Sequence, residues 1–271
     1  MIKAACIQTN AKPSLAESRE EAEHLIRTAA GQGAGFIVTP ENTCRMRADK
    51  AGKFAEAFVQ DEHPCVYFYA ALAEELSVYL CIGSLSSIWV GQDKLANRSF
   101  LFSPRGHIIS TYDKIHMFDV VLPNGDIYRE SDTHQRGTEA VIANIGEALV
   151  GMSICYDVRF PALYRTLAQK GAQILTVPAA FTVPTGQAHW KTLLRARAIE
   201  NGAYVLAPAQ CGVHEGGRGT WGHSMIISPW GDILAQAENQ PTFIMADLDM
   251  DQVAKARSAI PSLRHDQEYA F

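Results

Sequence analysis

The stretch G-M-S-I-C-Y-D-V-R-F-P, from Gly151 to Pro161, indicates how this chain folds around its chemistry. Residues 148–154 are apolar and few, as in a buried strand, and Pro161 pre-sets the first turn of a helix. Cys155 therefore stands between strand and helix, where backbone N–H groups left free by the turn point toward it. This position suits a nucleophile, because the same N–H groups can receive an oxyanion. The alternative is a small buried apolar side chain.

Length and composition allow one large domain or at most two, and we expect a single domain over residues 1–271. The chain has 271 residues, 47% of them hydrophobic, and a net charge of −5. No run of basic residues is longer than two, so we expect no nucleic-acid partner and no binding to anionic membranes. The uncharged stretch from Gly171 to Trp190 contains Pro178 and Pro184, which exclude a membrane helix.

The cysteines are widely scattered and form no C-x-x-C pair. This spacing argues against a zinc site and against a disulfide framework, and it predicts a reducing, cytoplasmic location. The six positions are Cys6, Cys44, Cys65, Cys81, Cys155 and Cys211.

Alternating strand and helix patterns predict an α/β fold with mixed sheets. A capping box at Ser14 and Glu17 begins the first helix, which ends near Gly31. Residues 116–137 lack periodicity, and we expect a long ordered loop at the site. We predict strands at 3–8, 36–39, 79–84, 97–102, 107–112, 173–178, 203–208, 224–228, 233–236 and 242–247, and further helices at 64–76, 162–169, 187–200 and 250–258.

Three reactive side chains follow predicted strands in the order Glu41, Lys114, Cys155. The first two stand in F-I-V-T-P-E and Y-D-K-I-H-M-F-D. Taken singly, Glu41 reads as a solvated loop residue, and Lys114 as the partner of Asp113 in a surface ion pair. Their settings and their order, taken together with the stretch around Cys155, favour a joint role.

In these motifs the chain resembles the nitrilase superfamily of carbon–nitrogen hydrolases. The likeness runs from end to end and includes A-H-W-K-T-L-L-R-A-R-A-I-E-N at Ala188–Asn201 and W-G-H-S-M-I-I-S-P-W-G at Trp221–Gly231. The resemblance implies a four-layer α-β-β-α sandwich, two mixed sheets flanked by helices. It also implies a homodimer whose sheets continue across both subunits, with no metal and no organic cofactor.

The resemblance also implies the roles of the site residues. Cys155 forms a thioester with the acyl group, and Glu41 acts as general base and then as general acid. Lys114 and the backbone N–H of Tyr156 stabilise the oxyanion. Glu130, in Y-R-E-S-D, supports Lys114; the alternative is a loop carboxylate in solvent.

Substrate contacts are implied for Arg159, Phe181 and Thr185. A guanidinium at position 159 suits a substrate carboxylate, which it can bind through two hydrogen bonds. Alternatively, Arg159 is structural and pairs with Asp157 or Glu200.

The segment Ala207–Ser224 is more similar to deaminated-glutathione amidases than to ω-amidases. It predicts hydrolysis of a small carboxylate-bearing amide, namely deaminated glutathione, to α-ketoglutarate and cysteinylglycine. The alternatives are ω-amidase activity on α-ketoglutaramate, or hydrolysis of an N-carbamoyl compound or another small amide. A nitrile substrate ranks low, because the pocket is expected to pair a carboxylate. A binding protein without turnover is disfavoured by the intact Glu41, Lys114 and Cys155.

A Cys–His dyad is the rival mechanism. Its candidates are His116, His189 and His223, for which packed, hydrogen-bonded roles are expected instead.

Overall fold

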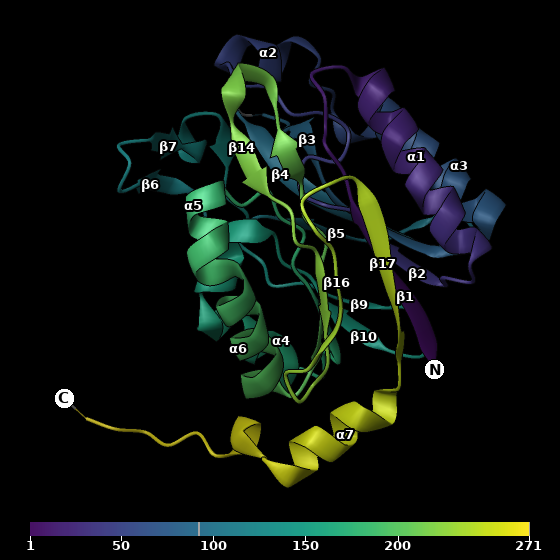
Figure 1. Cartoon of the computed structure of the whole chain (residues 1–271), viewed down its shortest axis with the longest axis vertical. Coiled ribbons are helices and arrows are strands. Elements are labelled where there is room, and N and C mark those ends of the chain that lie inside the picture. The colour runs from purple at the N-terminus through teal and green to yellow at the C-terminus, as the bar shows by residue number, and fades with distance from the viewer. Residues whose placement is uncertain (92, 271) are drawn as a thin grey trace.

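The computed structural model describes residues 1–91 and 93–270 and places two β-sheets between two pairs of helices (Figure 1). Ile26 of α1 and Leu72 of α3 pack on the outer face of the first sheet. Leu167 of α4 and Leu194 of α6 pack on the second sheet. The order of layers is therefore α-β-β-α, as predicted from the sequence.

The first sheet has the strand order β17-β1-β2-β3-β4-β5, with β8 paired to β4. β1, β2 and β3 are parallel, whereas β17, β4 and β5 join antiparallel, so the sheet is mixed. The strands are β1 (Ile2–Gln8), β2 (Phe36–Val38), β3 (Tyr79–Ile88), β4 (Leu95–Phe102), β5 (Ile108–Asp113), β8 (His134–Gln135) and β17 (Thr242–Leu248).

The second sheet has the order β16-β15-β12-β11-β10-β9, with β10, β11 and β12 parallel. Its strands are β9 (Ile142–Asn144), β10 (Leu149–Gly151), β11 (Ile174–Thr176), β12 (Tyr204–Ala207), β15 (Met225–Ile227) and β16 (Ile233–Gln236). Two small hairpins stand apart: β6 (Asp119–Val121) with β7 (Ile127–Arg129), and β13 (Cys211–Val213) with β14 (Gly219–Trp221).

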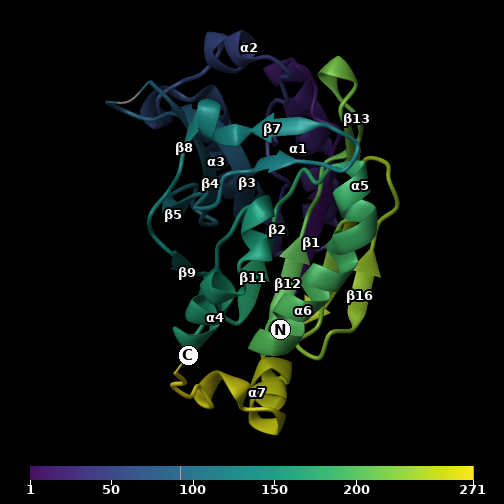
Figure 2. The ribbon, with the colours of Figure 1, turned by 90° about the vertical axis from the view of Figure 1, so that its left-hand side faces the viewer.

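The helices are α1 (Leu15–Gly31), α2 (Lys50–Ala55), α3 (Pro64–Leu76), α4 (Pro161–Gln169), α5 (Val183–Thr185), α6 (Lys191–Asn201) and α7 (Met250–Ala259). The side chain of Ser14 accepts a hydrogen bond from the N–H of Glu17, as the capping box predicts. Within residues 1–91 and 93–270, no helix is long and apolar enough to cross a membrane. Figures 1 and 2 place α2 and both small hairpins at the same end of the sandwich.

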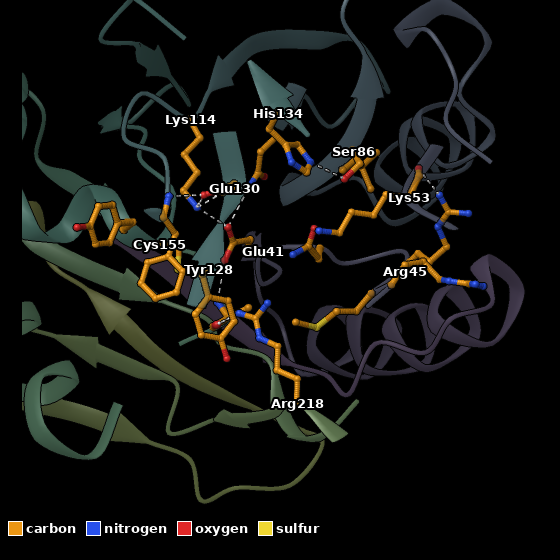
Figure 3. A pocket seen from close by; sticks show the side chains of 18 of the residues that line it. Glu41, Arg45, Lys53, Ser86, Lys114, Tyr128, Glu130, His134, Cys155 and Arg218 are labelled. Atoms are coloured by element: carbon orange, nitrogen blue, oxygen red, sulfur yellow. Dashed lines mark hydrogen bonds and ion pairs between the residues drawn. The ribbon is translucent and has the colours of Figure 1, made fainter. Parts of the chain in front are cut away.

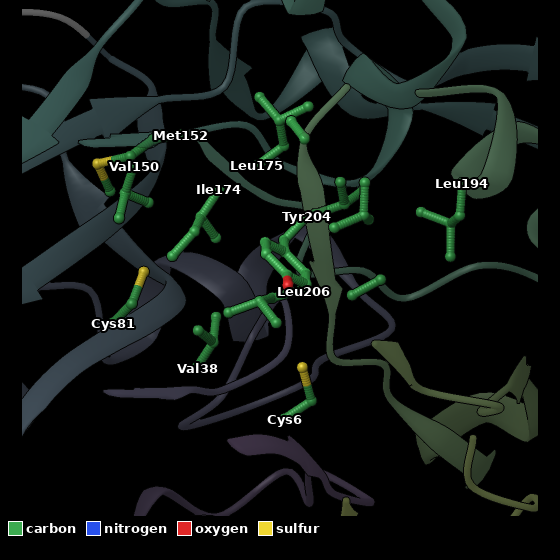
Figure 4. Close-up of a cluster of buried hydrophobic side chains, with 14 of the residues drawn as sticks. Cys6, Val38, Cys81, Val150, Met152, Ile174, Leu175, Leu194, Tyr204 and Leu206 are labelled. Carbon is green, nitrogen blue, oxygen red and sulfur yellow. The ribbon is translucent and has the colours of Figure 1, made fainter. Parts of the chain in front are cut away.

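The core follows the two-residue period of the strands. In β1, Ala4 and Cys6 face the space between the sheets, whereas Ala5 and Ile7 face the layer of α1 and α3. Figure 4 shows Cys6 and other side chains of the first sheet packed against side chains of the second. Both sheets therefore share one apolar layer.

Several short elements, among them α2, β9 and the β13–β14 hairpin, were not predicted from the sequence, and two longer segments differ from the expectation. The predicted loop at 116–137 contains the β6–β7 hairpin, whose three-residue strands are too short to show alternation. The helix predicted at 187–200 begins instead at Val183 and includes a π-helical turn at Gly186–Trp190. A Cβ on Gly186 would lie 2.2 Å from the ring of Trp221, so glycine permits this close contact.

Candidate active site

Cys155 lies in a strained turn after β10. It is the first residue of the 3₁₀ helix Cys155–Arg159 and has a φ of +51°, in the left-handed region that side chains other than glycine rarely adopt. Its N–H donates to the carbonyl oxygen of Pro178 at 2.8 Å. This turn points the thiol into a cleft and defines the nucleophile's position.

Buried Asp157 holds that turn. Its carboxylate accepts hydrogen bonds from the N–H of Ile154 (2.8 Å) and from the hydroxyl of Tyr112 (2.7 Å). It also accepts from the N–H of His116 at 3.0 Å and contacts the ring Nδ1 at 2.7 Å. His116 therefore helps to hold the turn at Cys155 through its contacts with Asp157.

Glu41 follows β2 and Lys114 follows β5, and the two side chains meet beside Cys155 (Figure 3). Lys114 Nζ donates to Glu41 Oε1 at 2.9 Å and to Glu130 Oε2 at 2.8 Å. Asn97 Nδ2 donates to both carboxylates, at 2.8 Å to Glu41 and 3.0 Å to Glu130. We call Glu41, Asn97, Lys114 and Glu130 the Glu–Lys network; every charge in it has an internal partner.

Burial and charge set the protonation states of this network. Burial alone would lower the pKa of Lys114, but the charges of Glu130 and Glu41 raise it well above its usual value. Burial opposes ionisation of Glu130, yet Lys114 and His134 lower the pKa of Glu130 to about 2. Burial and the charge of Glu41 raise the pKa of Cys155. The Cys155 side chain is therefore a neutral thiol beside the Glu41 carboxylate.

The cleft above the thiol occupies about 1140 Å³, including its open mouth, and Tyr156, Arg159, Phe181 and Thr185 line it together with the Glu–Lys network. The structure thus gathers all eight predicted site residues in one place. The Arg159 guanidinium lies 5.3 Å from the ring centroid of Phe181 and 5.8 Å from that of Tyr156.

Arg159 does not pair with the carboxylates that the sequence offered as alternatives. Asp157 is occupied by the nucleophile's turn, and Glu200 binds Arg197 at 2.7 Å. Among the described residues, no carboxylate forms an ion pair with Arg159. Its charge is therefore available to a ligand.

The histidines of the rival dyad stand outside the walls of this cleft. His189 is exposed and lies 3.4 Å from Arg159, and His223 stacks on Trp221. Two other histidines, His63 and His134, line the cleft. Burial lowers the pKa of His134 to about 4, which keeps its ring neutral.

Sequence reasoning missed several residues of the site. Ala180 donates its N–H to Glu41 Oε2 at 3.0 Å, and Gln210 Nε2 donates to the Glu41 carbonyl at 3.0 Å. Asn97 had one usable signal, because an amide in the apolar stretch L-A-N-R-S-F-L-F needs a buried partner. The residues searched, 1–91 and 93–270, hold no group of three or more His, Cys, Asp or Glu side chains suited to a metal ion.

Comparison with known proteins agrees with this geometry. The carbon-nitrogen hydrolase family model matches residues 3–258. A deaminated glutathione amidase of Synechocystis is 41% identical, with 97% of each chain covered. Omega-amidase NIT2 of Danio rerio is 34% identical over 95% of this chain and 91% of its own.

The crystal structure of the C. elegans NitFhit protein superimposes with a TM-score of 0.91 at 32% identity. That match covers 98% of this chain and 65% of the longer NitFhit chain. The chain therefore belongs to the carbon–nitrogen hydrolase family of the nitrilase superfamily and is an amide-hydrolysing enzyme.

Proposed function

We propose that this enzyme hydrolyses deaminated glutathione to α-ketoglutarate and cysteinylglycine. The observation that carries the substrate is Arg159, a half-buried cation in the cleft of Cys155 without an ion-pair partner among the described residues. A planar guanidinium binds a carboxylate through two hydrogen bonds, and the α-ketoglutaryl group supplies one. The name of the Synechocystis relative supports the same substrate.

In the proposed first step, Cys155 Sγ attacks the amide carbon and the thiol proton passes to Glu41. Lys114 Nζ and the backbone N–H of Tyr156 stabilise the oxyanion. The C–N bond then breaks, Glu41 returns the proton to the departing nitrogen, and a thioester remains on Cys155. The nearby charge of Glu41, which raises the pKa of Cys155, supports this assignment.

In the second step, Glu41 takes a proton from water, and the resulting hydroxide attacks the thioester carbon. The C–S bond breaks and the Cys155 thiol is restored with the proton from Glu41. Glu130 keeps Lys114 charged and oriented throughout, because it accepts hydrogen bonds from Nζ at 2.8 and 3.0 Å. Phe181 and Thr185 shape the acyl pocket beside Arg159.

The second candidate is ω-amidase activity on α-ketoglutaramate, with ammonia as the amine released. It uses the same acyl group and the same contact to Arg159, and the Danio rerio relative carries that name. Hydrolysis of an N-carbamoyl compound ranks below both, because its acyl part is a carbamoyl group, which has no carboxylate for Arg159 to bind.

The deciding experiment compares kcat/KM for the two substrates by following α-ketoglutarate release, with Cys155→Ser as the inactive control. We expect a preference for deaminated glutathione of ~100-fold or more, about 2.7 kcal/mol of transition-state binding. Arg159→Lys should lower kcat/KM for both substrates by ~10-fold, because the two-point hydrogen bonding is lost. A preference for α-ketoglutaramate would assign the enzyme to the second candidate.

We further propose that residues 1–271 form a single domain and that two copies pair as a cytoplasmic homodimer. The apolar layer shared by both sheets supports the single domain. The six free, buried cysteines support a reducing location. Light scattering coupled to gel filtration should give twice the chain mass of 29.7 kDa; a monomer would contradict the dimer.

A further inference from the structure

The cleft carries more positive than negative charge. Seven Lys and Arg side chains line it but only three Glu side chains: Arg45, Arg47, Lys53, Lys114, Arg129, Arg159 and Arg218 against Glu41, Glu56 and Glu130. A cleft with this balance attracts anions.

Internal carboxylates neutralise only part of this charge. Arg45 binds Glu56 at 2.6 Å and Arg47 binds Glu215 at 3.1 Å, and Lys114 belongs to the Glu–Lys network. Arg129 is exposed to solvent. Among the described cations that line the cleft, the half-buried ones without a carboxylate partner are Lys53, Arg159 and Arg218, which we call the open cations.

Lys53 projects from α2 into the cleft (Figure 3). Burial, together with the nearby charge of Arg218, lowers the pKa of Lys53. Lys53 and Arg218 line the same cleft, and an anion that binds to both would offset their charges.

Arg218 comes from the β13–β14 hairpin and is fixed in place. Its Nη2 donates to the Ala180 carbonyl oxygen at 2.9 Å, and its guanidinium lies 5.3 Å from the ring centroid of Tyr128. Its Nε is buried and has no hydrogen-bond partner among the described residues. The N–H of the same Ala180 donates to Glu41, so Ala180 links Arg218 to the proposed general acid.

Arg159 and Arg218 line the same cleft but have different neighbours. Arg159 packs against Phe181 and Tyr156, whereas Arg218 packs against Tyr128. A substrate with one carboxylate on each side of its scissile amide could use both cations. Cysteinylglycine, the amine released in the proposed reaction, ends in such a carboxylate.

We propose that Lys53 and Arg218 form a second anion subsite that binds the terminal carboxylate of the departing amine. Resting on the proposed function, the subsite selects amides whose leaving group is an anionic peptide over those that release ammonia. In this proposal Arg159 binds the acyl end of the substrate and the subsite binds its amine end.

The test uses three substrates with the full-length enzyme: deaminated glutathione, its C-terminal carboxamide and α-ketoglutaramate. The wild type should favour the free acid over the carboxamide by ~100-fold in kcat/KM, because two charge-assisted contacts are lost. Lys53→Met should lower kcat/KM for the acid by ~10-fold and leave the other two substrates within a factor of about 2. Arg218→Gln should act in the same direction.

Lys50→Met is the matched control, since Lys50 lies on the same helix but is exposed; it should leave all three rates unchanged. An equal acid-to-carboxamide ratio in the wild type and in Lys53→Met would overturn the subsite while leaving the proposed function intact. Turnover of α-ketoglutaramate alone would instead show that the proposed function has failed, and the subsite with it.

Discussion

The Glu–Lys network and the open cations lie in the same cleft but differ in how their charges are balanced. In the network, Lys114 is shared by two carboxylates, and Asn97 bridges the same pair. The open cations Lys53, Arg159 and Arg218 have no carboxylate partner in the part of the chain described. A buried charge that is paired within the fold is already in position before the substrate binds. An open cation gains its counter-charge only when an anionic ligand binds. In the proposed function, this contrast separates the groups that perform the chemistry from the groups that select the substrate.

The largest expected effect comes from breaking the network at its centre. Lys114→Met leaves two buried carboxylates without their cation, which should lower the free energy of unfolding by about 3–5 kcal/mol. Loss of the oxyanion contact should lower kcat/KM by ~1000-fold. Urea denaturation and steady-state kinetics measure the two effects. Lys170→Met, at the exposed residue that follows α4, is the control; an equally stable Lys114→Met enzyme would contradict the network.

The pKa of His134 depends on both the Glu–Lys network and the open cations, because Glu130, Lys114 and Lys53 all act on it. In the unfolded chain a histidine takes up a proton near pH 6.5, whereas in the folded protein burial delays this to about pH 4. The folded state therefore loses stability as the pH falls from about 6.5 toward about 4. Between pH 7 and pH 5 the loss attributable to His134 should be about 2 kcal/mol.

Urea titrations of the wild type and of His134→Asn at both pH values measure this loss. The variant should lack it, and the exposed His107→Asn should retain it. A pH dependence equal in the wild type and in His134→Asn would contradict a neutral, buried ring.

The smallest expected effect concerns Asn97, which positions the network without meeting substrate. Asn97→Ala should lower kcat by ~10-fold and leave KM unchanged, because the carboxylates lose one shared donor but the cations that bind substrate are untouched. Ser99→Ala, on the same strand and bonded to the Gly83 carbonyl, is the control and should keep its kcat. A rise in KM with an unchanged kcat would instead place Asn97 among the groups that bind substrate.

Local signals predicted the fold well where they were strong. The helix predicted at 64–76 is observed at Pro64–Leu76, because proline stands in its first turn, His63 caps its start, and Ser77 ends it in the left-handed conformation. The short β6–β7 hairpin and the six-residue helix α2 escaped prediction, because neither is long enough to show a hydrophobic period.

The residues of the site also differ in whether the sequence could predict them. The residues of the three motifs, around Glu41, Lys114 and Cys155, were predictable because each stands in a long, distinctive stretch. Lys53 and Arg218 were not, because one comes from the unpredicted helix α2 and the other from a glycine-rich hairpin. Only the tertiary fold brings both side chains to the same cleft, and a single sequence carries no record of that arrangement.

The protonated state of Cys155 also affects how the enzyme withstands oxidants. Peroxides attack the thiolate rather than the thiol, so burial and the charge of Glu41, which raise the pKa of Cys155, slow conversion of its sulfur to sulfenic acid. In the proposed mechanism the sulfur becomes strongly nucleophilic only as Glu41 removes its proton during attack on a bound amide. Under that mechanism, a thiol kept neutral between turnovers is protected while the cleft contains only solvent.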